Sequence, residues 1–250
     1  MERISIRGLC LDKVTKKQAL DFAFECLERK KLCRVYTPGT ELAWRCLKDK
    51  DTLETVNRAE LLLADGVGVV YASRIMGEAL PQKVAGVEFG EELIALCSEK
   101  KAPFRFFLLG AAEGVAEEAV KKLSEKYENA VFCGSYHGYF KKDGKESEDV
   151  CRIIRESGAD AVYVCFGQPV QEKWIEKYAD LCGASVFAAL GGSLDVFSGK
   201  VERAPAFFVK TGLEWFYRLI KEPKRFKRML CLPAYLFSTL FYRIFKGKSC

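Results

Sequence analysis

The residue best placed for chemistry is Asp65, which follows the apolar run LLLA (61–64) and precedes a Gly-Val-Gly segment. Such a run predicts a buried strand, and an aspartate directly after it lies at the ligand-binding edge of a parallel sheet. A carboxylate at that edge can act as a general base and take the proton of a hydroxyl group. The alternative is structural, because aspartate is a favoured N-cap and a helix is predicted over 67–76.

Polar and small residues also follow other predicted strands. Thr37 could contact a sugar or phosphate, although a turn and helix cap explains it better. Gly110 precedes a helix whose backbone N–H groups could hold a diphosphate. His137, the single histidine, lies in a loop of glycines and aromatic residues that suits contact with a base or sugar ring, or it has a structural role. Three further residues could form hydrogen bonds to substrate, namely Gln168, Gln171 and Glu172. They also have a structural explanation, because they lie in a loop and in the first turn of a predicted helix.

Metal ligands are scarce in this sequence. A single histidine excludes a His-rich site, and no two of the 11 cysteines have C-x-x-C spacing. Asp49 and Asp51 form a D-x-D pattern, by which many sugar-nucleotide enzymes hold a divalent cation, but no strand precedes them and the surrounding stretch is rich in lysine. We therefore expect no cofactor and no metal, so that protein cations must neutralise a leaving diphosphate. The candidates are three arginines near the C-terminus, namely Arg218, Arg225 and Arg228.

Continuous apolar strands alternate with helical segments along the chain, which predicts an α/β fold. A Rossmann-like, mostly parallel sheet with helices on both faces accounts for this pattern. The carboxyl ends of such strands meet at one edge, where ligands bind. The predicted strands are 34–38, 61–66, 104–109, 130–133, 161–166 and 185–190, and the predicted helices are 41–57, 116–127, 146–156 and 171–180.

Charge divides the chain of 250 residues into two predicted parts. Residues 210–250 hold ten basic and two acidic residues, net +8, whereas residues 1–209 are net −2, and the whole chain is +6. A hydrophobic content of 49% excludes a disordered chain. We predict an α/β catalytic core over 1–199 and a basic, amphipathic appendage over 200–250. The basic appendage requires an anionic partner.

The appendage carries apolar residues at helical spacing from Phe226 to Phe245. Its uncharged run, 229–242, is about 14 residues long, below the roughly 20 that span a bilayer. We expect a helical, membrane-binding appendage that lies on an anionic membrane surface. The alternatives are a helix docked on the core with its stripe hidden, or a tail that binds RNA or DNA. Because nucleic-acid faces are polar, no nucleic-acid partner is expected, and an exposed stripe also suggests a homo-oligomer.

Scattered cysteines and an N-terminus without an apolar segment favour a cytoplasmic location.

A set of short motifs, in order along nearly the whole chain, resembles the WecG/TagA/CpsF glycosyltransferases, glycosyltransferase family 26. Any one motif is weak, but the ordered set is specific. The motifs are Thr37-Pro38, residues 64–68 (ADGVG), 81–86 (PQKVAG), 107–110 (FLLG), 138–140 (GYF), 166–172 (FGQPVQE), 191–195 (GGSLD), 203–205 (RAP), 212–218 (GLEWFYR) and Glu222-Pro223.

The resemblance, closest to TagA-type members, implies an inverting glycosyltransferase. Such members move N-acetylmannosamine from UDP-N-acetylmannosamine to N-acetylglucosaminyl-diphospho-undecaprenol. The product is a β-1,4 disaccharide, and the step belongs to wall teichoic acid linkage-unit synthesis. The resemblance thus implies a protein that is peripheral on the inner face of the plasma membrane. Other relatives use UDP-N-acetylmannosaminuronic acid or a hexose donor in exopolysaccharide or common-antigen synthesis. A more distant alternative, a nicotinamide-dependent oxidoreductase, is disfavoured because the chain has no G-x-G-x-x-G motif.

The resemblance also implies roles for individual residues. It makes Asp65 the general base, Thr37, Gln171 and Asp195 parts of the pocket, and the three C-terminal arginines ligands of the diphosphate. The chain departs from the family pattern at two substrate-binding positions. Gly39 replaces the usual asparagine after Thr-Pro, and Lys83 replaces an arginine, keeping the charge but losing the bidentate geometry.

Overall fold

A six-stranded parallel sheet forms the centre of the computed structural model, which describes residues 1–205, 207–208, 213–221, 226 and 230–246. The strand order is β4-β3-β8-β7-β5-β6, and every neighbouring pair is parallel. The predicted fold class is therefore confirmed. The strands are β3 (Cys33–Tyr36), β4 (Leu61–Leu62), β5 (Arg105–Gly110), β6 (Val131–Tyr136), β7 (Ala161–Cys165) and β8 (Val186–Ala189).

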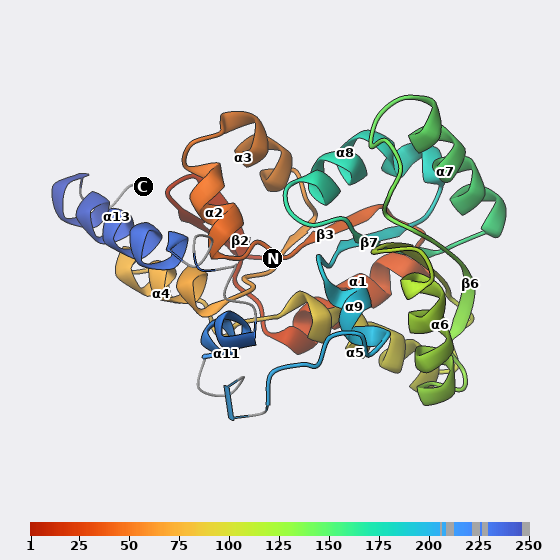
Figure 1. Ribbon diagram of the computed structural model, residues 1–250. Coiled ribbons are helices and arrows are strands. Elements are labelled where there is room, and N and C mark those ends of the chain that lie inside the picture. The colour runs from red at the N-terminus through yellow and green to blue at the C-terminus, as the bar shows by residue number, and fades with distance from the viewer. Residues whose placement is uncertain (206, 209–212, 222–225, 227–229, 247–250) are drawn as a thin grey trace.

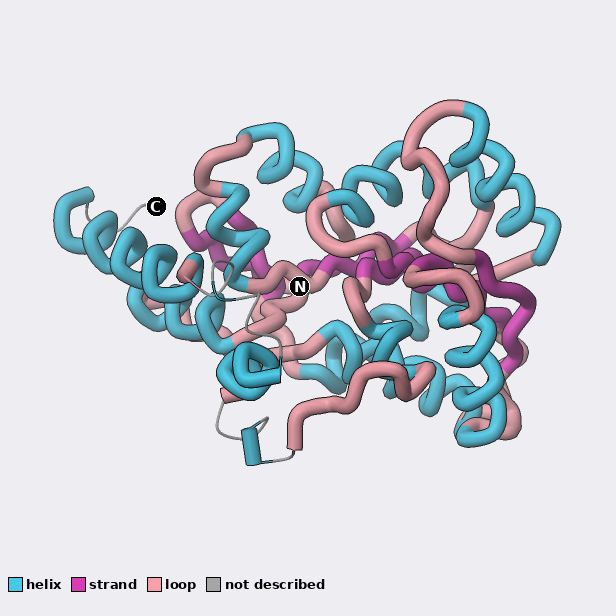
Figure 2. Tube along the Cα trace, in the orientation of Figure 1, coloured by secondary structure: helices cyan, strands magenta, loops and turns pink. Residues whose placement is uncertain are grey.

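Helices cover both faces of this sheet, as Figures 1 and 2 show. Successive side chains of a strand point to opposite faces, so Phe107 and Leu109 enter one hydrophobic core while Phe106 and Leu108 enter the other. This double burial explains why the strands are continuous apolar runs. One layer holds α2 (Thr40–Cys46), α3 (Lys50–Asn57), α7 (Lys145–Ser157) and α8 (Val170–Cys182), and the other holds α1 (Lys16–Glu28), α5 (Gly86–Glu99), α6 (Val115–Lys126) and α9 (Ser193–Phe197).

The predicted helix over 41–57 is wrong in one respect, because the structure has two helices there. Helix α2 ends at Cys46, and Asp49 begins α3 as its N-cap, accepting the backbone N–H of Thr52 at 3.2 Å. An aspartate cap favours a new helix start over continuation of the old one.

An N-terminal hairpin, β1 (Arg3–Ile6) and β2 (Leu9–Asp12), was not predicted. Its two-residue turn places Arg7 and Gly8 at positive φ, 54° and 93°. The hairpin joins the main body through Asp12, whose carboxylate accepts the backbone N–H of Leu62 at 2.7 Å and pairs with Arg3 at 3.0 Å.

The C-terminal segment includes α11 (Glu214–Lys221) and α13 (Cys231–Lys246). Helix α13 packs against α2 and α4 (Val67–Met76), as Figure 1 shows. Tyr235 and Thr239 are buried there, and Ser238 accepts a 2.6 Å hydrogen bond from Arg7. The opposite side of α13 remains exposed through Phe237, Leu240, Phe241, Ile244 and Phe245. The docked-helix alternative is therefore right for one face of α13 and wrong for the other.

Across the described ranges, none of the helices combines the length and the apolar character needed to cross a bilayer.

Candidate functional site at the carboxyl edge of the sheet

Asp65 lies in the loop between β4 and α4, at the carboxyl edge of the sheet. Its Oδ2 atom accepts the backbone N–H of Gly86, the first residue of α5, at 3.1 Å, and its own N–H donates to the Pro38 carbonyl at 3.2 Å. The proposed capping of α4 is wrong, because Gly66 is the N-cap of that helix and has no side-chain bond. Asp65 instead binds the amino end of α5 through its Oδ2 atom.

Thr37 directly follows β3. Its hydroxyl donates to the carbonyl of Ala189, the last residue of β8, at 3.0 Å, and only 3% of the residue is exposed. A Cβ atom built on Gly86 would lie 2.8 Å from the Thr37 hydroxyl oxygen. Position 86 is therefore restricted to glycine by close packing, and Thr37 and Asp65 both contact the same residue.

Two glutamines connect the ends of β3, β7 and β8. The Nε2 atom of Gln168 donates to the Thr37 carbonyl at 2.9 Å. The buried Oε1 atom of Gln171 accepts the backbone N–H groups of Gly167 at 3.2 Å and Gly191 at 3.0 Å. These bonds hold the loops after two neighbouring strands against each other, so the predicted residues of three strand ends form one network.

Glu172 is fully buried directly behind this network. Its Oε1 atom accepts from the Gln171 amide at 3.0 Å, while Oε2 is buried without a hydrogen-bond partner. Burial raises the pKa of Glu172 to about 7 from an ordinary value near 4.5. A perturbed carboxyl group of this kind is typical of functional sites.

Gly39 and the residue after Lys83 both approach the backbone of residues 64 and 65, since the Val84 N–H donates to the Ala64 carbonyl at 2.9 Å. Gly39 is the N-cap of α2, and a Cβ atom there would lie 3.2 Å from the Asp65 carbonyl oxygen. Lys83 points to the C-terminal segment, where its Nζ atom pairs with Glu214 at 3.0 Å.

Gly110 lies at the end of β5, two strands from β8. Its φ is 141°, and a Cβ atom would lie 2.4 Å from the Cys165 carbonyl oxygen, so close approach of β7 accounts for this glycine. His137 lies just after the neighbouring β6. Its ring stacks on Tyr136 with centroids 4.5 Å apart, and Nδ1 accepts the Tyr139 N–H at 3.1 Å.

Asp195 is a half-buried residue of α9, the helix that follows β8. Its carbonyl oxygen accepts the Val201 N–H at 2.9 Å. Arg218 lies within α11, whereas Arg225 and Arg228 lie outside the described residues. The structure therefore tests the placement of Arg218 in the helix but not that of the other two arginines.

The D-x-D residues have structural partners. Asp49 caps α3, and Asp51 forms an ion pair with Lys173. Within the described ranges, no group of three or more His, Cys, Asp or Glu side chains is arranged to hold a metal ion. Independence from metal stays a prediction.

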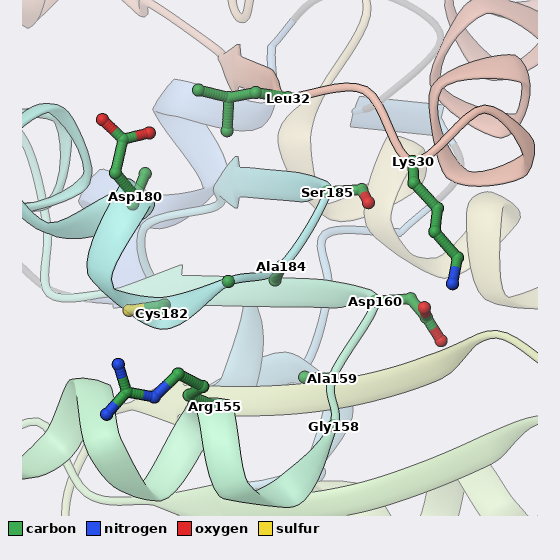
Figure 3. Close-up of a pocket in the computed structure, with 12 residues that line it drawn as sticks. Lys30, Leu32, Arg155, Gly158, Ala159, Asp160, Asp180, Cys182, Ala184 and Ser185 are labelled. Carbon is green, nitrogen blue, oxygen red and sulfur yellow. The ribbon is translucent and has the colours of Figure 1, made fainter.

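A separate cavity of about 360 Å³ lies at the opposite edge of the sheet (Figure 3). Asp160 and Ser185, which line it, directly precede β7 and β8. It contains no residue of the Asp65 network.

Sequence reasoning missed two residues that the structure places beside the site. Gly86 supplies the N–H group that binds Asp65, and Glu214 supplies the partner of Lys83. Both residues lie in motifs that carry the resemblance, but each contact joins residues that are far apart in the sequence.

The fold and the carboxylate at its parallel-sheet edge are those of a Rossmann-like α/β protein with a candidate ligand site at the carboxyl ends of its strands. A sequence model described as the glycosyl transferase WecG/TagA/CpsF family matches residues 4–249. The chain belongs to this family, and the predicted glycosyltransferase class is confirmed.

Curated relatives agree with this assignment. The chain is 38% identical over 206 residues to the N-acetylglucosaminyldiphosphoundecaprenol N-acetyl-beta-D-mannosaminyltransferase of Bacillus subtilis (strain 168), covering 82% of this chain and 78% of the relative. It is 35% identical over 214 residues to the enzyme of the same name from Bacillus spizizenii, covering 86% and 81%. It is 31% identical over 248 residues to that of Staphylococcus aureus (strain MW2), covering 98% and 93%.

Proposed function

We propose that this protein transfers N-acetylmannosamine from UDP-N-acetylmannosamine to N-acetylglucosaminyl-diphospho-undecaprenol, forming a β-1,4 bond in wall teichoic acid linkage-unit synthesis. The names of the relatives support this acceptor and this sugar. The structural observation that carries the proposal is the Asp65 carboxylate, held at the carboxyl edge of the sheet by the Gly86 N–H group.

The reaction is a direct displacement at the anomeric carbon of the donor. The 4-hydroxyl oxygen of the acceptor sugar attacks this carbon while Asp65 takes the hydroxyl proton. The bond from the anomeric carbon to the UDP oxygen breaks, UDP leaves with the electron pair, and the configuration inverts. Arg218, Arg225 and Arg228 neutralise the departing diphosphate, so that no metal is required.

The acceptor is lipid-linked, and the exposed face of α13 supports docking on a membrane. Phe237, Phe241, Ile244 and Phe245 are each more than 60% exposed and follow helical spacing. A face of this kind inserts its side chains between headgroups while basic residues contact anionic lipid. The protein then acts as a peripheral enzyme on the inner face of the plasma membrane.

The alternative function is transfer of another sugar, such as N-acetylmannosaminuronic acid or a hexose, on the same fold. A donor panel with a short-chain lipid diphosphate acceptor separates the two. Mass spectrometry of the product should show addition of one N-acetylhexosamine from UDP-N-acetylmannosamine and no uronic acid. Transfer of a different sugar at a higher rate would overturn the proposed donor.

A further inference from the structure

Lys83 and Glu214 form an ion pair between the core and helix α11. The Nζ and Oε2 atoms are 3.0 Å apart, and the side chains are only 18% and 13% exposed. An exposed ion pair contributes little to folding stability. In a largely desolvated pair, by contrast, removal of one partner is strongly destabilising.

Two hydrogen bonds connect the segment that follows Lys83 to residues 64 and 65. The Val84 N–H donates to the Ala64 carbonyl at 2.9 Å, and two residues later the Gly86 N–H donates to Asp65 at 3.1 Å. A short segment, 83–86, therefore contacts the proposed base at one end and the C-terminal segment at the other.

Helix α11 begins at Glu214, and Arg218 follows four residues later. Four residues are about one turn of an α-helix, so Arg218 is carried by the same helix that Glu214 attaches to the core. The position and rotation of α11 on the core thus determine where Arg218 stands relative to the Asp65 loop.

We propose that the Lys83–Glu214 ion pair positions α11 on the core, and that Lys83 acts on sugar transfer through this helix and not by contact with substrate. The kinetic part of this inference rests on the proposed function. It makes Lys83 and Glu214 positioning residues, and it replaces the substrate-binding role that the family pattern implies for position 83.

Loss of either partner removes a largely desolvated ion pair between α11 and the core, which favours movement of α11 away from the core. A displacement of about 1 Å at a reacting group lowers rate on the order of 100-fold. The loss should appear mainly in kcat, because the arginine stabilises charge that develops on the leaving group.

The experiment compares Lys83→Met, Glu214→Gln and the charge-swapped double variant Lys83→Glu/Glu214→Lys with the unmodified protein. The first readout is amide hydrogen exchange of 214–221 in full-length protein without substrate. The second is kcat and donor KM with UDP-N-acetylmannosamine and a short-chain lipid diphosphate acceptor. Lys126→Met is the matched control, since Lys126 pairs with Glu91 at 2.6 Å on the α5 and α6 side of the core, and thermal unfolding reports whether each variant folds.

We expect faster exchange in α11 and a loss of about 10- to 100-fold in kcat for both single variants. The swapped pair should recover protection and part of the rate, and the control should change neither. Unchanged exchange in Lys83→Met, or a swap that recovers nothing, would overturn the proposal and return Lys83 to direct substrate contact. If the unmodified protein transfers no sugar while α11 still loses protection, the proposed function fails and the positioning contact stands.

Discussion

The Asp65 carboxylate binds the backbone nitrogen of Gly86, with 3.1 Å between Oδ2 and N. This contact joins the loop after β4 to the first residue of α5 and holds the carboxylate at the edge of the sheet. The arrangement separates two properties of Asp65, since the hydrogen bond requires only an oxygen acceptor, whereas general-base catalysis requires a group that can take a proton.

Replacement of Asp65 by asparagine should therefore remove activity without unfolding the protein. Asparagine retains an oxygen for the Gly86 N–H but cannot act as the base, so kcat should fall by about 10²–10⁴-fold. The measurement is the initial rate of transfer to a short-chain lipid diphosphate, with thermal unfolding as the control. Near-normal turnover by Asp65→Asn would exclude the assigned role.

Gly86→Ala should destabilise the protein. The added Cβ atom would lie 2.8 Å from the buried Thr37 hydroxyl oxygen, so backbone or side chain must shift, at about 1–3 kcal/mol of unfolding free energy. Gly192→Ala is the control, because the nearest atom to its Cβ position is 3.9 Å away. Denaturant unfolding of both variants tests the difference, and equal midpoints would contradict close packing at position 86.

Glu172 should make the protein less stable as pH rises from about 4.5 to about 7. Its folded pKa is raised to about 7, so the folded state binds more protons than the unfolded state in this range, and stability is lost as the buried carboxyl ionises. The facing groups Tyr36 and Cys46 have pKa values raised by burial and stay neutral throughout.

Chemical denaturation of Glu172→Gln at pH 5 and pH 7.5 checks this expectation. The amide is neutral at both, so the variant should lose less stability across the range than the unmodified protein. Glu113→Gln, at an exposed position, should keep the original dependence. Identical pH dependence in all three proteins would rule out the buried carboxyl as its source.

Phe237→Glu and Phe241→Glu together should weaken binding to anionic vesicles on the order of tenfold or more, since each replaces an apolar ring that would enter the lipid. These side chains are 72% and 63% exposed, so the fold should be retained. Tyr139→Glu, 79% exposed on the loop after β6, is the control. Co-sedimentation with phosphatidylglycerol vesicles gives the comparison, and unaltered binding of the double variant would move the membrane contact elsewhere.

EDTA should leave the transfer rate unchanged, because the proposed mechanism neutralises the leaving diphosphate with arginine side chains. The test is the initial rate with EDTA and with added Mg²⁺. A rate abolished by EDTA and recovered by Mg²⁺ would contradict this part of the mechanism.

The sheet was predictable because burial on both faces selects strands such as AVYVC (161–165), in which every residue is buried. The location of Asp65 at the sheet edge followed from the same pattern. The bonds around it did not, since the Asp65–Gly86 contact spans 21 residues and depends on how α5 docks. The N-terminal hairpin escaped prediction because its stabilising Asp12 acts through a bond to Leu62, which lies 50 residues away in the sequence.

Lys83 shows a further limit of motif reasoning. A basic residue at a family position indicates that positive charge is needed, but its partner is defined only by the fold, and here that partner is Glu214, 131 residues away. The long-range geometry of a largely buried ion pair leaves no local signal in sequence.

The hydrogen bond between Arg7 and Ser238 joins the beginning of the chain to helix α13 near its end. The surfaces that receive α13, namely the hairpin turn, α2 and α4, all belong to the first third of the chain. These elements precede residue 231 in the chain, so they leave the ribosome before α13 does. Docking on them covers Tyr235 and Thr239, so the phenylalanine-rich face is presented alone only in the folded protein, and the proposed membrane contact depends on folding of the core.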